Sequence, residues 1–191
     1  MAPETMQEFI REGKIRFWGI SYGSEDYGRR AHAVCPVTCV QVRYSMLPRW
    51  NERLFPLLEQ LDIGFVVLSP LANGFLTSAG QRGVTFSGAL DYRGRMPQYS
   101  EAGREKARPL LELLETMARA KHVTPALLSL AWVFARKPYI VPIPGSTKTG
   151  RIRENAEAAA ITLAPDELAA IDTLLAGAEL QVFGEQEKNG F

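Results

Sequence analysis

Short runs of apolar and β-branched residues recur along the chain, and glycine, proline or polar residues separate them. Runs of this length and composition predict buried β-strands. Between several of them, apolar residues recur every three or four positions, a period that predicts amphipathic helices. The predicted strands cover residues 15–20, 38–44, 65–68 and 139–143.

Strands and helices alternate in this prediction, and the strands are almost continuously apolar. That pattern predicts a parallel sheet covered by helices. It fits either an open doubly wound sheet or part of an eight-stranded (β/α)8 barrel. A complete barrel needs about 250 residues, and the chain has 191. The predicted helices cover residues 3–12, 24–33 with Ser24 as cap, 50–61, 104–121, 124–136 and 165–175, and another begins near Gly150.

The connection over residues 71–103 is rich in Gly, Ser, Arg and Tyr and has no clear period. A connection of this length without regular structure is usually functional or mobile. Its part around residues 91–99 fits either a segment that closes over a substrate or a solvated loop. We favour the solvated loop.

Composition narrows the classes of function. The formal net charge is +1, which gives no indication of nucleic acid or an acidic surface as a partner. No apolar run approaches the ~20 residues of a membrane span, so we expect no membrane partner. Cys35 and Cys39 have neither metal-binding nor redox spacing, which favours a reduced, cytoplasmic setting. We predict no metal site.

The most informative stretch is residues 138–155. A strand ends at Ile143, a turn of small residues follows, and Thr149 is placed to cap the next helix. Backbone N–H groups at such a helix start suit a phosphate. Arg151 and Asn155 are four residues apart and share a helix face. With Ser146 and Lys148 they form a candidate site for a phosphate and a purine edge; the alternative is a solvated helix end with ordinary surface cations.

Four stretches together resemble one known family. Residues 13–21, 40–45, 64–71 and 143–155 are similar to the fifth-, sixth-, seventh- and eighth-strand motifs of the aldo-keto reductases. The match runs in the family's order and spacing from about residue 3 to about residue 176. The resemblance implies a (β/α)8 barrel that moves a hydride between NADPH and a carbonyl.

The resemblance also implies roles for residues on the strand ends. Ser21 and Gln41 match residues that hold the nicotinamide carboxamide, and an amide side chain suits this role because it both donates and accepts. Tyr22 stands where the best-known members carry Asn. Leu68 stands where many members present an aromatic ring, so it can pack on the nicotinamide but not stack.

Further matches imply contacts to the rest of the cofactor. A nearby Lys and Arg favour NADPH over NADH, because the extra phosphate gives each cation a charged partner. The matched residues are Ser69, Leu71 and Asn73 along the pyrophosphate, Ser146, Lys148 and Arg151 at the adenosine 2′-phosphate, and Glu154 and Asn155 at the adenine.

Only the C-terminal half of the family's barrel is matched. The family's tetrad of Asp, Tyr, Lys and His lies on earlier strands, so we expect no catalytic residue here. We expect residues 1–176 to form a partial barrel of about four parallel strands with covering helices, followed by a polar tail over residues 177–191. This expectation describes a fragment that is inactive alone and self-associates through open barrel edges. The full-length enzyme would reduce a small aldehyde or ketone.

Two alternatives of different kinds stay open on the sequence. One is a non-catalytic NADP(H)-binding or interaction module on the same fold. The other is an unrelated phosphate-binding α/β enzyme. Loss of NADPH binding on changing Arg151 would argue against the second.

Overall fold

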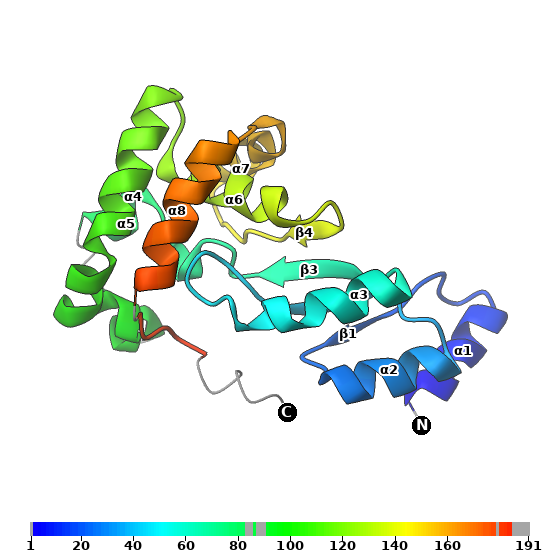
Figure 1. Cartoon of the computed structure of the whole chain (residues 1–191). Coiled ribbons are helices and arrows are strands. Elements are labelled where there is room, and N and C mark those ends of the chain that lie inside the picture. Colours follow the sequence, from blue (N-terminus) through cyan, green and yellow to red (C-terminus); the bar gives the residue numbers. More distant parts are fainter. Residues whose placement is uncertain (1, 83–85, 87–90, 179, 185–191) are drawn as a thin grey trace.

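The computed structural model describes residues 2–82, 86, 91–178 and 180–184. Within these residues, parallel strands form one sheet in the order β1-β2-β3-β4 (Figure 1). The predicted α/β fold with parallel strands is confirmed. The strands are β1 (Gly19–Ser21), β2 (Cys39–Arg43), β3 (Gly64–Leu68) and β4 (Ile140–Pro142).

Helices connect the strands and extend beyond them. Ser24 caps α2 as predicted, because its hydroxyl accepts from the Tyr27 N–H. Thr124 caps α6 in the same way through the Leu127 N–H. The α-helices are α1 (Ala2–Arg11), α2 (Glu25–Val34), α3 (Phe55–Leu61), α4 (Ser78–Gln81), α5 (Glu101–Ala120), α6 (Pro125–Arg136), α7 (Thr149–Glu157) and α8 (Pro165–Gly177). The 3₁₀ helices are η1 (Trp50–Leu54), η2 (Ala72–Gly74), η3 (Tyr92–Arg95), η4 (Pro97–Tyr99) and η5 (Ala158–Ala160).

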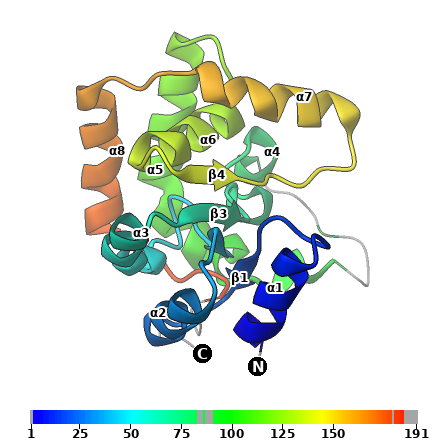
Figure 2. The same ribbon diagram turned by 90° about the vertical axis from the view of Figure 1, so that its right-hand side faces the viewer.

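The two faces of the sheet differ in burial. Helices α2, α3 and α8 lie on one side of the strands (Figure 2). Side chains of the covered face belong to the main core, which also contains Ala31 of α2, Leu58 of α3 and Trp132 of α6. The register aligns Ile20, Val40, Phe65 and Ile140 as one buried row on this face. The row next to it, on the opposite face, consists of Ser21, Gln41, Val66 and Val141.

The opposite face of the sheet is less buried than the face that the helices cover. Val141 is 54% exposed and Ile143 is 46% exposed, although the run that contains them was expected to be buried. Both residues lie at the edge strand β4, where no described element packs over their side of the sheet. The apolar run over residues 139–143 therefore predicted more burial than these residues have in the structure.

Strand β1 is shorter than the predicted run over residues 15–20. Pairing starts only where β2 begins, with Gly19 opposite Cys39. The residues before it extend past the end of the neighbouring strand, and Phe17 is exposed. The predicted helix over residues 50–61 is also divided, into η1 and α3, with Pro56 in the first turn of α3.

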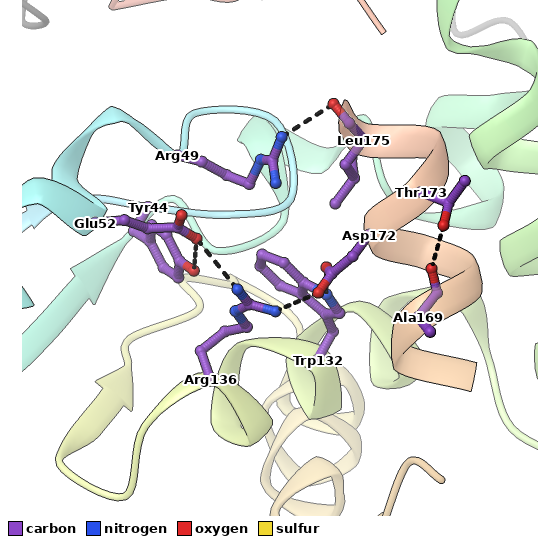
Figure 3. Close-up of polar contacts among 9 residues, drawn as sticks. All are labelled: Tyr44, Arg49, Glu52, Trp132, Arg136, Ala169, Asp172, Thr173 and Leu175. Carbon is purple, nitrogen blue, oxygen red and sulfur yellow. Dashed lines mark hydrogen bonds and ion pairs between the residues drawn. The ribbon is translucent and has the colours of Figure 1, made fainter. Parts of the chain in front are cut away.

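A polar network fastens the segment after β2 to two helices (Figure 3). Arg136 of α6 bonds Asp172 of α8 at 2.6 Å and lies 3.8 Å from Glu52. Glu52 in turn accepts from the hydroxyl of Tyr44 at 2.7 Å. Burial and this carboxylate raise the pKa of Tyr44 far above its ordinary value. Tyr44 is thus a fully buried core residue.

The end of the described chain returns to the protein body. Val182 is buried, and the Phe183 N–H donates to the Gln98 side-chain oxygen at 3.1 Å. The remainder of the predicted polar tail, residues 185–191, lies outside the described residues. No helix in the described ranges is both long and apolar enough to cross a bilayer.

Candidate functional site

A cleft of about 720 Å³ opens where β3 and β4 end. This volume falls within the range of small-molecule sites. Four segments form its walls: the turn after β3, the connection that contains α4, η3 and η4, the start of α6, and the turn from β4 into α7. Its described lining residues include Ser69, Leu71, Asn73, Thr77, Arg82, Arg93, Tyr99, Thr124, Ser146, Arg151, Glu154 and Asn155.

The turn after β3 has an unusual backbone. Ser69, Ala72 and Asn73 have φ angles of 52°, 50° and 59°, in the left-handed region that non-glycine residues seldom adopt. The Tyr99 hydroxyl donates to the Asn73 carbonyl at 3.1 Å, and the Ala72 N–H donates to the Ser69 carbonyl. Because these bonds fix the turn, its backbone is presented to the cleft in one conformation.

The opposite segment carries the predicted phosphate residues. The Ser146 hydroxyl accepts from the Lys148 N–H at 3.1 Å, which closes the turn before α7. The predicted cap is wrong by one residue: Lys148 is the N-cap residue, without a side-chain cap bond, and Thr149 is the first helical residue. Arg151 and Asn155 nevertheless share the helix face that lines the cleft.

Positive charge outweighs negative charge in this cleft. Arg82, Arg93 and Arg151 line it, whereas Glu154 is the carboxylate among its described lining residues. Glu154 accepts a hydrogen bond from Thr124 at 2.8 Å, which ties α7 to the start of α6. A concave site with this balance attracts anions.

The predicted site residues fall into three places. Seven of them line the cleft, in the list given above. Lys148 lies at its edge in the N-cap position and is exposed. Ser21 and Gln41 do not line the cleft, but they are register partners on β1 and β2, and the Tyr22 N–H donates to the Gln41 carbonyl.

Residues 91–99 are not the solvated loop favoured from the sequence. They form η3 and η4, and Met96, Gln98 and Tyr99 are buried. Sequence reasoning therefore missed Arg93 and Tyr99 as cleft residues. Two 3₁₀ turns have no helical period to detect, and the signals present were the acid two residues before Arg93 and the aromatic residues around it.

Comparisons with known proteins agree on one family. The aldo/keto reductase family model matches residues 2–176. "Probable aldo-keto reductase 1" of Glycine max is 35% identical over 165 residues, which are 85% of this chain and 47% of that protein. The chain thus spans about half the length of this curated relative.

Comparison with solved structures agrees with this family. An aldo-keto reductase from Klebsiella pneumoniae in complex with NADPH has a TM-score of 0.65 and 27% identity, over 94% of this chain and 55% of that one. The glycerol dehydrogenase of Gluconobacter oxydans has a TM-score of 0.85 and 23% identity, over 93% of this chain and 54% of that one. At 23% identity, the glycerol dehydrogenase is evidence for the fold alone, and this fold is of the (β/α)8-barrel family. From its family-model match and its 35% identical relative, the chain belongs to the aldo/keto reductase family.

Proposed function

We propose that this chain forms the NADP(H)-binding, C-terminal half of an aldo-keto reductase barrel that reduces an aldehyde or ketone. The observation that carries the proposal is that Ser146, Arg151 and Asn155 open onto the same cleft as the turn after β3. A dinucleotide needs an anion-binding pocket and an extended wall in one hollow, and this cleft offers both. NADPH, when bound, supplies the hydride.

Each part of the cofactor has candidate partners in this proposal. Arg151 and Ser146, with Lys148 at the edge, would hold the 2′-phosphate, and Glu154 and Asn155 would lie at the adenine. The pyrophosphate would follow the turn that contains Ser69, Leu71 and Asn73. Ser21 and Gln41 would hold the nicotinamide carboxamide, since their register places them on neighbouring strands of the uncovered face.

We propose that the described strands correspond to the fifth to eighth strands of the barrel and that the family's tetrad belongs to strands before them. This chain then binds the cofactor without turning over substrate. An assay of NADPH-dependent carbonyl reduction tests this part. Clear turnover by the purified chain would show that the tetrad argument is wrong.

Calorimetric titration of the chain with NADPH and, separately, with NADH tests the pocket. Arg151→Met should weaken NADPH binding about tenfold or more, because a charge-assisted bond to phosphate is lost. NADH binding should change little, since NADH lacks the 2′-phosphate. Arg153→Met is the matched control: it removes the same charge in the same helical turn, and Arg153 does not line the cleft.

Two results would contradict the proposal. One is a wild-type chain that binds neither dinucleotide. The other is an Arg151→Met chain whose preference for NADPH over NADH equals that of the wild type. If the Arg151→Met and Arg153→Met chains lost NADPH affinity equally, Arg151 would act only through general surface charge and not through a bond to the 2′-phosphate.

A further inference from the structure

Arg93 reaches the cleft from a segment far in sequence from α7. It lies in η3, two residues after Asp91, and it lines the cleft together with Gly74 and Arg151. Its side chain is 41% exposed, so solvent and a ligand can both reach it. The family resemblance in the sequence assigned this residue no role.

Asp91 fixes the orientation of the Arg93 guanidinium. Its carboxylate accepts from Nε at 2.8 Å and from Nη2 at 2.6 Å, and it also accepts from the Arg93 N–H at 3.2 Å. The guanidinium also lies over the Phe86 ring, 5.1 Å from its centroid. The bond to Arg93 keeps the pKa of Asp91 below its ordinary value, so the pair stays ionised at neutral pH.

This orientation places the third nitrogen against the turn after β3. Nη1 lies 3.9 Å from the position that a Cβ atom would take on Gly74. Gly74 follows Asn73, whose backbone carbonyl accepts from the Tyr99 hydroxyl and whose side-chain Nδ2 donates to the Tyr92 hydroxyl at 3.4 Å. Segment 91–99 thus holds both the turn backbone and the guanidinium, so the two form one preorganised wall.

We infer that Arg93 binds the pyrophosphate bridge of the dinucleotide, with Asp91 as its positioning residue. The inference rests on the proposed function. A guanidinium held in place by a carboxylate loses little side-chain freedom on binding, and its remaining N–H groups suit phosphate oxygens. Arg93 and Arg151 would then bind different phosphates, because they project from separate segments of the cleft.

Two ligands separate these roles in the full chain. NADPH contains the pyrophosphate, whereas adenosine 2′-monophosphate has the adenine and the 2′-phosphate but no pyrophosphate. Arg93→Met should weaken NADPH binding about tenfold or more and leave adenosine 2′-monophosphate binding within about twofold. Arg151→Met should weaken the binding of both ligands.

Arg95→Met is the matched control, since Arg95 lies in the same 3₁₀ helix, is exposed and does not line the cleft. It should leave both affinities unchanged. Arg93→Lys keeps the charge and should lose less NADPH affinity than Arg93→Met. This variant also decides the question if Arg93→Met fails to fold, because retained binding of adenosine 2′-monophosphate shows an intact adenosine pocket.

The inference is overturned if Arg93→Met leaves NADPH affinity unchanged, or if it weakens both ligands equally, which would mean that Arg93 only shapes the cleft. A wild-type chain that binds neither ligand would instead overturn the proposed function, and the inference with it. A wild-type chain that binds both ligands, with no change in any Arg93 variant, would leave the proposed function standing and remove only the role of Arg93.

Discussion

Tyr99 shows how one side chain joins two distant parts of the cleft. Its ring packs edge-on against Phe75, with centroids 5.2 Å apart, and its hydroxyl donates to the Asn73 carbonyl at 3.1 Å. The residue therefore connects η4 to the left-handed turn after β3. Burial raises the pKa of Tyr99 to about 12.

Tyr99→Phe should lower the free energy of unfolding by about 1 kcal/mol, because the Asn73 carbonyl loses a neutral hydrogen bond. Urea denaturation measures this change. Tyr92→Phe is a suitable comparison: Tyr92 is exposed, and its contact with Asn73 is longer, at 3.4 Å. Its effect should be smaller, and an equal effect in the two variants would contradict the role assigned to Tyr99.

The raised pKa of the Tyr99 hydroxyl predicts that the free energy of unfolding declines at alkaline pH. The ordinary pKa of tyrosine is 10.0, and the folded-state pKa of Tyr99 is raised to about 12. A raised pKa contributes stability that is fully present below pH ~10 and is lost as the pH rises toward 12. Tyr99→Phe should therefore reduce the alkaline decline in unfolding free energy. Some decline should remain, because the pKa values of Tyr44 and Tyr139 are raised as well.

At the scale of residues, prediction from the sequence succeeded where it rested on the number of positions between two residues. The separation of four residues placed Arg151 and Asn155 on one helix face, and both line the cleft. It failed for the cap of α7 by one position: the helix already begins at Thr149 and its start has no side-chain cap bond, so the preference of Thr for the N-cap position is not realised. Arg93 was missed because its orientation depends on Asp91 and on a turn that lies elsewhere in the chain.

At the scale of elements, the contacts around Arg136 hold α6, α8 and the segment after β2 together. The Arg136 guanidinium lies over Trp132, 5.0 Å from the ring centroid, and the Trp132 indole N–H donates to Asp172 at 3.2 Å. Arg49 adds a bond to the carbonyl of Leu175 near the end of α8 (Figure 3). These contacts hold α8 against α6 and against the segment that follows β2.

Arg136→Met should lower the free energy of unfolding by about 1–2 kcal/mol, because the partly buried Asp172 loses its charged partner. Thermal or denaturant unfolding measures the loss. Arg30→Met is the control: Arg30 forms an exposed pair with Asp26 on α2, and such pairs contribute at most about 0.5 kcal/mol. Equal losses in the two variants would contradict the network's role.

Most elements were predictable from sequence, because hydrophobic period and capping residues are local signals. The starts of α2 and α6 follow directly from Ser24 and Thr124. Burial of whole elements was less predictable, since it depends on which other elements pack against them. Strand β4 was found in its predicted place, yet Val141 is exposed, because an apolar run does not reveal how many of its faces are covered.

At the scale of the whole molecule, the uncovered sheet face and the edge strands β1 and β4 are the dominant features. Val141 and Ile143 are exposed on β4, and edge strands present backbone groups that pair readily with another chain. We propose, as expected from the sequence, that copies of this chain associate through this face and these edges.

Val141→Asp should shift the chain toward the monomer, because a charge on the associating face opposes its burial. Sedimentation velocity over a range of concentrations measures the shift. Ile152→Asp is a matched control, since Ile152 is similarly exposed but lies on α7, and it should leave association unchanged. A wild-type chain that remains monomeric at all concentrations would contradict the proposal.

Because the strands follow one another in the sheet as they do in the chain, folding should proceed in stages. The connections over residues 22–38 and 44–63, which join the first three strands, are shorter than the connection between β3 and β4. Strand β4 joins β3 only after the connection over residues 69–139 has closed, and closing a longer loop costs more entropy. In pulse-labelled hydrogen exchange, amides of β2 and β3 should become protected before those of β4.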